Sequence, residues 1–468
     1  MKNIWEEVLK KENIQYTDNY FLLGGNSISA IKIISIMKKR IPIEKEIPLS
    51  YMFSYPTINA LAEKILDGSK AEESIYNITA KQLQKEIQID ISVSDSFGEK
   101  KKNCFLTGGN GYLGGYLLRD LIKLTDYEVY CLVRGKSKDE GWAKLKKSLD
   151  RFLLSEEELK RVHVVLGDLG KNHLGIEERE YQELSEKIDC IYHNGALVHF
   201  LFTYEELKSA NVTGTKEILQ FAVKSRIKPV YYMSTISIFS KFGKESQDVW
   251  ENEDIHDSGI LPVGYTQSKW VAEGLIWEAK KRGVPVMVFR LGHIVGDSLT
   301  GECHSDDFVF RIVKSCLKIR SYPDMEGKIE PVAVDDVSKS IVRLSASKDN
   351  YGKAFHIVNP AALHFQDVLA WAKKKEILLQ PVSKKEWVKE IESLEDGAAI
   401  SPFLHFFDDE LWDTFQDLTL HTEKTTEALK KAGMAIQPVS EEMMDKFFSY
   451  LSGKGVLEIE GDITVGTL

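Results

Sequence analysis

The sequence predicts an α/β chain in which a small helical bundle precedes a doubly wound parallel sheet and a mostly helical C-terminal subdomain. Residues 1–67 contain short helix-like segments separated by turns. From residue 103 onward, short apolar runs alternate with segments of helical spacing, the pattern of a parallel sheet covered by helices on both faces. We expect the bundle at 1–67, a linker at 68–102 with one helix near Ala80–Ile87, the sheet domain at 103–300, and the C-terminal subdomain at 301–468, with some segments returning to the sheet domain.

The composition is that of a globular protein without a signature for nucleic acid or membrane. The 468 residues are 43% hydrophobic and 28% charged, with a formal net charge of −10. Such a chain has enough apolar residues for packed cores and lacks the basic stripe of a nucleic-acid binder. We find no apolar run of about eighteen residues and no apolar stretch like that of a signal peptide at the N-terminus. We therefore expect a cytoplasmic protein with no nucleic-acid or membrane partner.

The cysteines indicate a reducing environment. The five cysteines contain no CxxC pair, so their spacing suggests neither a zinc site nor a redox pair, and we expect no metal. Cys104, Cys131 and Cys190 lie in apolar runs, which predicts buried free thiols.

Short apolar runs, each followed by a helical segment, predict the strands of the sheet. They are Cys104–Thr107, Glu128–Val133, His163–Leu166, Cys190–His193, Val230–Met233 and Val286–Arg290. Their number and alternation match a Rossmann-like doubly wound fold that binds a dinucleotide. Ala354–Val358 is a further candidate strand, and residues 361–450 read as helices with several aromatic side chains.

A glycine-rich turn follows the first predicted strand and opens a helix. Gly108, Gly111 and Gly114 in the run TGGNGYLG have the spacing GxxGxxG. Glycines permit the tight turn, let a pyrophosphate approach the backbone N–H groups of the helix N-terminus, and allow the helix to pack closely on the strand. Loops often collect glycines for structural reasons alone, but the strand–turn–helix context favours a dinucleotide site.

The ends of the following strands refine the cofactor. An NAD site usually places an acid about 20 residues past the turn to bind the ribose hydroxyls, whereas this chain has Arg134 in the run LVRG. A guanidinium pairs with a 2′-phosphate, so NADP is favoured, although a solvated arginine is the simpler structural explanation. Asp168 either accepts from the adenine amino group or caps the following turn. Asn194 and Ala196 are small residues where the cofactor passes.

Two histidines beside that stretch invite a metal assignment. His193 ends the fourth strand and His199 lies in the loop that follows it. Lone histidines at strand ends are more often packing or loop residues, and no carboxylate pattern joins these two.

Hydroxyl-bearing residues and a lysine predict a carbonyl-reducing site. Tyr265 and Lys269 are four residues apart and share one helix face. A carbonyl that receives a hydride becomes an oxyanion and needs a proton donor, and a nearby ammonium stabilises the phenolate. Thr235 at the end of the fifth strand completes the set, with Ser234 as the fallback because strand side chains alternate. The pair YxxxK also occurs on ordinary helix surfaces, so its position after the fifth strand carries the prediction.

Residues 103–300 resemble the extended short-chain dehydrogenase/reductase family, and within it the thioester reductase domains of nonribosomal peptide synthetases, aminoadipate reductases and carboxylic acid reductases. The matching runs are TGGNGYLG, LVRG, GDL, HNGALVHF, NVTGT, STISIF, GYTQSKWVAE and FRLGHIVGD. The family more often has TGATGFLG at the first run, a departure that leaves the glycines intact. The resemblance implies a catalytic set of Thr235, Tyr265 and Lys269, and a substrate-side lid beyond about residue 300. On the matched runs, the expected cofactor contacts are Thr107, Gly108, Asn110, Gly111, Tyr112, Leu113, Gly114, Arg134, Asp168, Leu169, Asn194, Ala196 and Lys269.

A serine at a helix start marks the N-terminal module. Ser27 follows the glycines of LGGNS and opens a periodic helix, where it is either a plain N-cap or the attachment point of phosphopantetheine, whose phosphate suits the positive helix end. Residues 1–67 are similar to peptidyl carrier domains in the opening helix, in DNYF before the glycines and in FSYPT before the last helix. Many carriers have Asp or His in place of Asn26. The resemblance implies a phosphopantetheine arm on Ser27.

A carrier followed by a reductase resembles the terminal arrangement of a synthetase with reductive release. We expect NADPH to reduce the thioester on Ser27 to an aldehyde or alcohol. The expected partners are upstream adenylation and condensation modules, a phosphopantetheinyl transferase and an acyl or peptidyl substrate. Because the chain has no adenylation segment and begins at the first carrier helix, we expect an excised piece. The alternatives are an epimerase or dehydrogenase acting on a free small molecule, and a catalytically silent module that docks partners.

Overall fold

The computed structural model describes most of the chain. The described residues are 1–25, 27–41, 47, 51–52, 55–67, 78–93, 102–200, 202–240, 247–255, 260–261, 263–304, 307–325, 328–361, 363–364, 366–367, 369, 377–394, 398–407 and 418–455. Asn26, the side chain of Ser27, Phe53 and Ser54 of the FSYPT run, and 68–77 and 94–101 of the expected linker lie outside this description.

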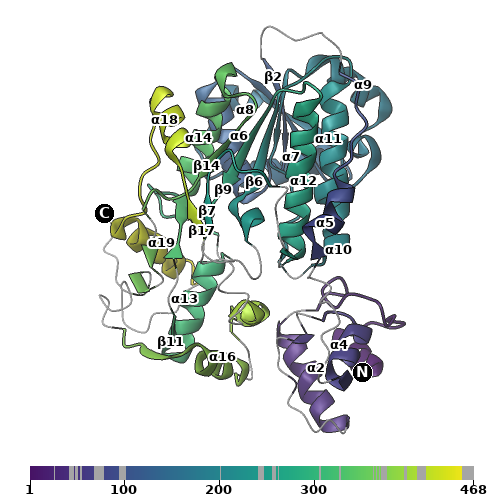
Figure 1. Cartoon of the computed structure of the whole chain (residues 1–468), viewed down its shortest axis with the longest axis vertical. Helices are drawn as coiled ribbons and strands as arrows, with labels where there is room; N and C mark the ends of the chain where they lie inside the picture. Colours follow the sequence, from purple (N-terminus) through teal and green to yellow (C-terminus); the bar gives the residue numbers. More distant parts are fainter. Residues whose placement is uncertain are drawn as a thin grey trace.

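The N-terminal unit is a small helical bundle, as the sequence predicts. Its helices are α1 (Lys2–Leu9), α2 (Ser27–Arg40) and α4 (Ile58–Asp67), drawn in purple in Figure 1. Trp5 of α1 is fully buried and meets Tyr20 edge-on, with ring centroids 5.1 Å apart. Burial of such large rings supplies much of the stability of a small core.

Residues 78–93 of the expected linker pack against the sheet domain. β1 (Ile78–Thr79) pairs antiparallel with β8 (Ile260–Leu261), and Thr79 caps α5 (Ala80–Leu83), which continues into the 3₁₀ turn η1 (Gln84–Glu86). A Cβ on Gly274 would lie 2.4 Å from the Cδ1 atom of Ile87, so this segment packs closely on the helix that contains Gly274.

Within the described residues, seven strands form one parallel sheet in the order β14-β9-β6-β5-β2-β3-β4. The predicted α/β class and all six predicted core strands are confirmed, with bounds that differ by at most two residues. The seventh strand is the candidate near Ala354. The strands are β2 (Asn103–Thr107), β3 (Glu128–Val133), β4 (Val162–Leu166), β5 (Cys190–His193), β6 (Val230–Thr235), β9 (Val286–Leu291) and β14 (Lys353–Ile357).

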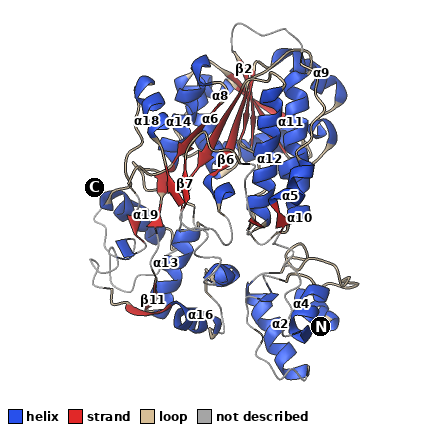
Figure 2. Ribbon diagram, viewed as in Figure 1, coloured by secondary structure: helices blue, strands red, loops and turns tan. Residues whose placement is uncertain are grey.

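Helices cover both faces of the sheet, as Figure 2 shows. Alternate side chains of β2 enter different cores: Cys104 and Leu106 pack toward α6 (Tyr112–Leu124), α7 (Lys138–Leu149) and α14 (Val334–Ser345). Phe105 packs toward α9 (Glu178–Lys187), α11 (Gly214–Val223) and α12 (Gly264–Lys281). Two buried faces explain why the strands are mostly apolar. The shorter helical segments are α8 (Glu156–Lys160), α10 (Tyr204–Lys208), η2 (Asn172–Gly175), η3 (Ser209–Thr213), η4 (Ile236–Phe239) and η5 (Lys348–Asn350).

The C-terminal part contributes to two cores. β14, α14 and α18 (Glu423–Lys431) return to the sheet domain. A separate core forms around α13 (Phe308–Ile319), α16 (Lys384–Glu392), η6 (Ser401–Phe407) and α19 (Glu441–Gly453), and its centre includes the buried rings of Trp387, Phe447 and Phe448.

The prediction that residues 361–450 are helical is incomplete. Short strands pair there, because β16 (Gln380–Ser383) pairs with β11 (Ser321–Asp324), β15 (Leu363–His364) with β12 (Lys328–Ile329), and β17 (Leu418–Leu420) with β7 (Gln247–Val249). A further pair joins β10 (His293–Val295) to β13 (Pro331–Ala333). Strands of two to four residues are too short to leave an alternation that a sequence reveals.

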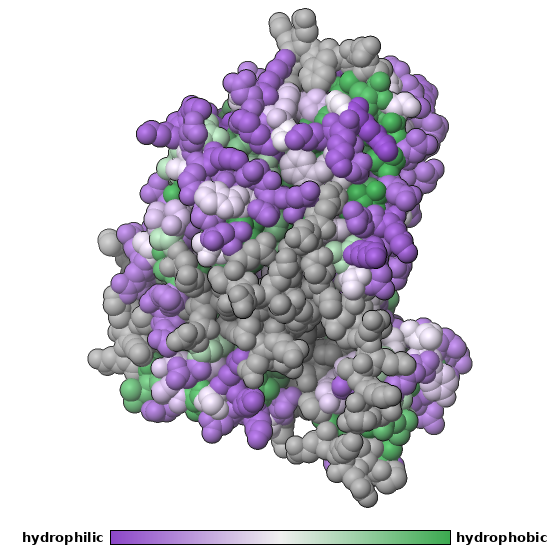
Figure 3. All heavy atoms as spheres, viewed as in Figure 1, coloured by the Kyte–Doolittle hydropathy of each residue, from purple (hydrophilic) through white to green (hydrophobic). Residues whose placement is uncertain are grey.

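The outer surface and the thiols agree with the composition. Figure 3 shows mainly hydrophilic side chains over the visible face of the sheet domain. All five cysteines are buried and free, as expected for Cys104, Cys131 and Cys190. None of the described helices is long and apolar enough to cross a bilayer.

Candidate active site

The glycine turn between β2 and α6 leaves room for a dinucleotide phosphate. Gly108 has φ +72°, which favours glycine, and a Cβ there would lie 2.8 Å from the Cα atom of Gly195. A Cβ on Gly114 would lie only 1.8 Å from the Gly108 carbonyl oxygen. Gly111 precedes α6 without a capping side chain, so the first N–H groups of the helix lack a side-chain partner. These features fit a pyrophosphate at the helix N-terminus.

A buried hydrogen-bond chain forms the floor beneath this turn. Thr107 Oγ1 and Thr215 Oγ1 lie 2.9 and 3.0 Å from the two ring nitrogens of His193. Thr215 Oγ1 donates to the Asn211 carbonyl, so it accepts from His193 Nε2–H, and His193 Nδ1 accepts from Thr107. Burial lowers the pKa of His193 to about 3, which keeps the ring neutral. His193 is therefore a packing residue, as its isolation in the sequence favours.

Asn211 joins the loop after β5 to the helix that contains Tyr265. Its side-chain amide exchanges two hydrogen bonds with the backbone of Leu197, at 2.7 and 3.0 Å. Its Nδ2 also donates to Ser268 Oγ at 2.9 Å, and Ser268 lies next to Lys269. Asn211 belongs to the matched run NVTGT, but sequence reasoning assigned it no role because its partners are 14 and 57 residues away.

The other expected cofactor residues lie along the carboxyl ends of the strands. Some of their side chains pack or form hydrogen bonds within the protein, and others are exposed. Asn194 Nδ2 donates to the Gly108 carbonyl at 3.4 Å, and Ala196 is half-buried in the same loop. A Cβ on Gly195 would lie 2.7 Å from a methyl group of Leu169, so Leu169 backs this loop. Asn110 is exposed at the tip of the glycine turn. The first helical turn of α6 also contains Tyr112 and Leu113.

Tyr112 and Leu113 are partly used by packing. Tyr112 donates its hydroxyl to the Glu302 carbonyl at 2.9 Å, and burial raises its pKa. Leu113 packs on the core beneath α6. Only the backbone of these two residues is therefore well suited to face a phosphate.

The predicted adenine end contains Arg134 and Asp168. Arg134 follows β3, and its exposed guanidinium makes no hydrogen bond or ion pair with the residues that the structure describes. Asp168 accepts from the Gly170 N–H at 3.0 Å through one carboxylate oxygen, so it caps the turn after β4. The turn-capping alternative for Asp168 thus occurs here.

Tyr265 and Lys269 lie on one face of α12, opposite the end of β6. Lys269 is 4% exposed, donates from Nζ to the Met233 carbonyl at 2.6 Å, and lies 4.1 Å above the Tyr232 ring. Burial lowers the pKa of Lys269 to about 7. Burial also raises the pKa of Tyr265 to about 12, so its phenol is protonated at neutral pH.

The two hydroxyls at the end of β6 point to opposite sides. Ser234 Oγ is buried and donates to Glu273 Oε2 at 2.5 Å. Thr235 is half-buried, and its Oγ1 accepts from the Ser237 N–H at 3.2 Å. Ser234 is therefore committed to the core, which leaves Thr235 as the candidate hydroxyl of β6.

We expect a lysine-to-methionine change at position 269 to alter how stability depends on pH. Because the pKa of folded Lys269 is about 7 against an ordinary 10.5, the unfolded chain binds more protons between these values, and wild-type stability rises with pH there. Urea denaturation should show the wild type gaining on Lys269→Met by up to about 1.4 kcal/mol per pH unit from pH 7 to 10. Parallel curves for the two proteins would show that Lys269 is not desolvated.

The carrier bundle presents a helix start at its candidate attachment residue. α2 begins at Ser27, two residues after Gly25, and the preceding Gly24 has φ +90°. A Cβ on Gly25 would lie 2.4 Å from the Tyr20 ring, so the loop is packed tightly onto that ring. The hydroxyls of Tyr20 and Ser29 make a short hydrogen bond that ties the loop to the first turn of α2. A phosphate at Ser27 would sit at the positive end of this helix.

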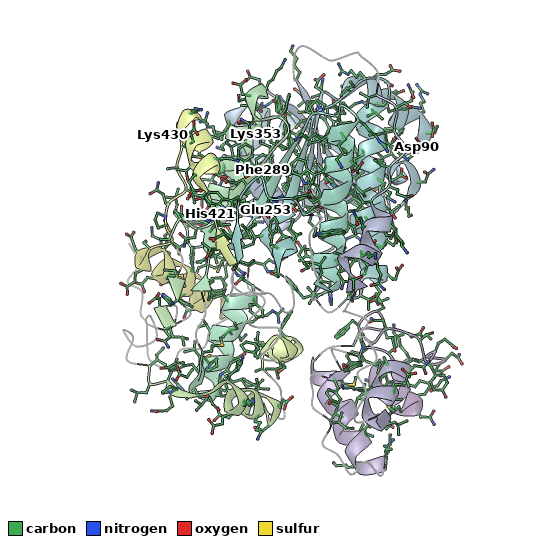
Figure 4. The ribbon with its side chains drawn as sticks, viewed as in Figure 1. Asp90, Glu253, Phe289, Lys353, His421 and Lys430 are labelled. Atoms are coloured by element: carbon green, nitrogen blue, oxygen red, sulfur yellow. The ribbon has the colours of Figure 1, made fainter. Side chains whose placement is uncertain are left out.

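A cavity of about 1060 Å³ lies away from all of these residues. It is bounded by the C-terminal end of α12, by β14 and by α18, and it includes none of the predicted site residues. Glu253 and Lys353, two of its lining residues, are labelled in Figure 4. The volume of a cavity does not by itself identify a functional site. The shifted pKa values of Tyr265 and Lys269, together with their position at the end of β6, are the stronger indication of a site.

Comparison with known families matches both units of the chain. The family model described as "Male sterility protein", an NAD-binding family, matches residues 106–341, half of the chain. The chain belongs to this NAD-binding family. A second model, described as a phosphopantetheine attachment site, matches residues 1–65. The resemblance to a carrier–thioester reductase didomain is thereby confirmed. The didomain is an oxidoreductase whose cofactors are a nicotinamide dinucleotide and phosphopantetheine.

The didomain is similar to segments of large synthetases and reductases. It is 36% identical to a linear gramicidin synthase protein of Brevibacillus parabrevis, over 97% of this chain and 9% of that protein. It is 29% identical to the L-2-aminoadipate reductase of Saccharomyces cerevisiae, over 92% of this chain and 34% of that protein. The didomain thus spans well under half the length of these two curated relatives.

Solved structures agree with this family. The terminal R domain of the myxalamid PKS-NRPS pathway is 34% identical, with a TM-score of 0.72 over 81% of this chain and 99% of that chain. A thiolation-reductase di-domain of an archaeal nonribosomal peptide synthetase shares the fold, with a TM-score of 0.73 over 97% of each chain at 22% identity.

Proposed function

We propose that the didomain uses NADPH to release an acyl or peptidyl chain from phosphopantetheine by reducing its thioester. The observation that carries the proposal is that two features occur in the same chain. One is the set of Tyr265 and Lys269 at the carboxyl edge of a dinucleotide-binding sheet, and the other is a phosphopantetheine attachment domain. The sheet domain alone would fit many reactions, because this architecture supports many functions. The carrier restricts the substrate to a thioester, which matches the relatives named as peptide synthetases and aminoadipate reductases.

In the proposed reaction, the residues of α12 and β6 act on the thioester oxygen. A nicotinamide held at the carboxyl edge of the sheet would supply the hydride for the thioester carbon. Tyr265, which burial keeps protonated at neutral pH, donates its proton to the oxygen as negative charge develops there. Thr235 supplies a second hydrogen bond to the same oxygen.

Lys269 lies one helical turn from Tyr265. When it is charged, it favours the phenolate that Tyr265 becomes. The hemithioacetal then breaks its C–S bond, and the pantetheine thiol leaves with a proton, which gives an aldehyde. A second reduction of the aldehyde gives the alcohol.

We expect Arg134 to select NADPH over NADH. Its exposed guanidinium follows β3, where it can pair with a 2′-phosphate. Arg134→Ala should raise the KM for NADPH about tenfold and leave the KM for NADH nearly unchanged, in line with the loss of one charge-assisted contact. Steady-state kinetics with both cofactors measure this, with Lys136→Ala as the matched control on the same loop. An equal effect on both cofactors would contradict the assignment.

The proposed reaction implies partners outside the didomain. A phosphopantetheinyl transferase has to load Ser27, and upstream adenylation and condensation modules have to supply the acyl or peptidyl chain. We place this assembly in the cytoplasm, where reduced thiols and NADPH are maintained, in keeping with the five buried free cysteines.

Loading Ser27 tests the proposed function directly. A promiscuous phosphopantetheinyl transferase would attach a simple aminoacyl-pantetheine to Ser27 of the didomain. Oxidation of the cofactor would then be followed by absorbance at 340 nm. We expect oxidation of NADPH in the wild type and none in Ser27→Ala, because the substrate is then not delivered. Oxidation that does not depend on Ser27 would favour a dehydrogenase for a free small molecule. Failure to bind NADPH would favour a silent docking module.

A further inference from the structure

An aromatic contact joins the carrier bundle to the reductase domain. Phe21, in the loop that leads to Ser27, lies against His199 with ring centroids 5.9 Å apart and planes inclined at 54°. This spacing is within the range of a direct aromatic pair. Figure 1 shows the bundle beside the lower end of the sheet domain, near α10 and α12.

The reductase side of the contact is firmly supported. The His199 ring stacks on Phe202 at 3.7 Å between centroids. The backbone of Phe202 in turn packs on α12, because a Cβ on Gly264 would lie 2.3 Å from the Phe202 carbonyl oxygen. Burial lowers the pKa of His199, and its buried Nδ1 has no hydrogen-bond partner among the described residues. A neutral ring without a polar partner is suited to an aromatic surface on the carrier.

The same loop leads directly to the candidate active site. Phe200, the residue after His199, meets the ring of Tyr265 edge-on at 5.3 Å between centroids. One residue of the loop therefore faces the carrier, and the next faces the candidate proton donor. A carrier held at His199 is therefore held beside the residue that contacts Tyr265.

On the carrier, Phe21 is connected to the start of α2, the helix that begins at Ser27. Phe21 packs edge-on against Tyr20 at 5.2 Å, and its N–H donates to Asn19 Oδ1 at 2.8 Å. Tyr20 reaches the first turn of α2 through its hydroxyl contact with Ser29. The position of Phe21 is thus coupled to the start of the helix that begins at Ser27.

We propose that the Phe21–His199 contact is the docking point through which this chain's own carrier presents its pantetheine arm to the reductase. The proposal rests on the proposed function for its biological meaning. Docking raises the effective concentration of the thioester at Tyr265 without contributing to the chemistry. The specific partner of the His199–Phe202 surface is therefore the Tyr20–Gly25 loop of the carrier.

A comparison of two substrates tests the proposal. Single-turnover reduction of the thioester on Ser27 would be measured beside steady-state reduction of a free acyl N-acetylcysteamine thioester. His199→Ala should slow the carrier-bound reaction by about tenfold and change kcat/KM for the free thioester by less than about twofold, because only delivery is affected. The matched control is His163→Ala, since His163 also stacks on an aromatic ring, that of Tyr130, but lies on β4.

The outcomes separate this inference from the proposed function. Equal losses with both substrates, or no loss with either, would overturn the docking role of His199. If the wild type reduces neither thioester, the proposed function fails, and the contact is judged by cross-linking alone. With a short bis-maleimide, the pair Phe21→Cys and His199→Cys should cross-link within one chain, whereas Phe21→Cys with Leu124→Cys should not. The five native cysteines are buried and do not compete. Equal yields for the two pairs would overturn the contact.

Discussion

Tyr265→Phe should lower the single-turnover rate of thioester reduction by about 10²–10⁴-fold, the range for loss of a general acid. The change removes only the phenol oxygen. Burial raises the pKa of Tyr265 to about 12, so the wild-type side chain has its proton to donate at neutral pH. NADPH affinity should stay near the wild-type value, since the phenol acts on the substrate oxygen rather than on the dinucleotide. Stopped-flow absorbance at 340 nm and cofactor fluorescence titration measure the two quantities.

A second tyrosine provides the control for that result. Tyr204 also has a buried hydroxyl, which has no hydrogen-bond partner among the described residues, but it lies on α10. Tyr204→Phe should retain most of the wild-type rate. If Tyr265→Phe retained most of the rate as well, the proton would have to come from another group, and the catalytic assignment of Tyr265 would be wrong.

Glu273→Ala should destabilise the reductase domain by about 3–5 kcal/mol, the usual effect of removing one partner of a buried ion pair. Glu273 Oε1 accepts from Arg290 at 2.8 and 3.0 Å, and the two side chains are 0% and 1% exposed. Without the carboxylate, the guanidinium remains buried with no counter-charge beside it. Its described neighbours are then backbone carbonyls, the Phe239 ring and the His356 Nε2 atom 3.4 Å away. Ser234 would also lose its acceptor, next to Thr235. Urea denaturation followed by tryptophan fluorescence measures the loss.

Two further variants show whether the destabilisation comes from the unpaired charge. The double change Glu273→Leu with Arg290→Met removes both charges and should recover much of the stability. Glu140→Ala breaks an exposed pair with Lys144 on α7 and should cost far less stability than Glu273→Ala. A Glu273→Ala variant as stable as Glu140→Ala would show that Arg290 is reached by water or that its charge is compensated elsewhere.

Much of the sheet domain was predictable because its signals are local. Each core strand is a short, mostly apolar run, and most of these strands are buried on both faces, so the run is visible without knowing its neighbours. Tyr265 and Lys269 share a helix face because helical periodicity alone brings them together. The glycine turn was predictable for the same reason, because its three glycines lie within seven consecutive residues at the start of α6.

The supporting contacts were not predictable because they join residues that are far apart in the sequence. Glu273 lies on a helix and Arg290 on a strand, and no local pattern shows that the two pair in the core. Asn211 gave no signal that its amide would hold the backbone of Leu197. The contact of Phe21 with His199 joins two folding units across 178 positions, which no periodic pattern encodes. The short paired strands of the C-terminal subdomain fall below the length at which alternation is visible.

Transfer of deuterium from labelled NADPH tests the central claim most directly. The didomain would be loaded with an aminoacyl thioester on the pantetheine of Ser27 and mixed with NADPH that bears deuterium at the transferred position, with carrier and product followed by mass spectrometry. Reductive release predicts that the carrier returns to its unloaded pantetheinyl mass while the released aldehyde gains one deuterium, or the alcohol two. Release of an unlabelled carboxylic acid, or a carrier that stays loaded although NADPH binds, would contradict reductive release.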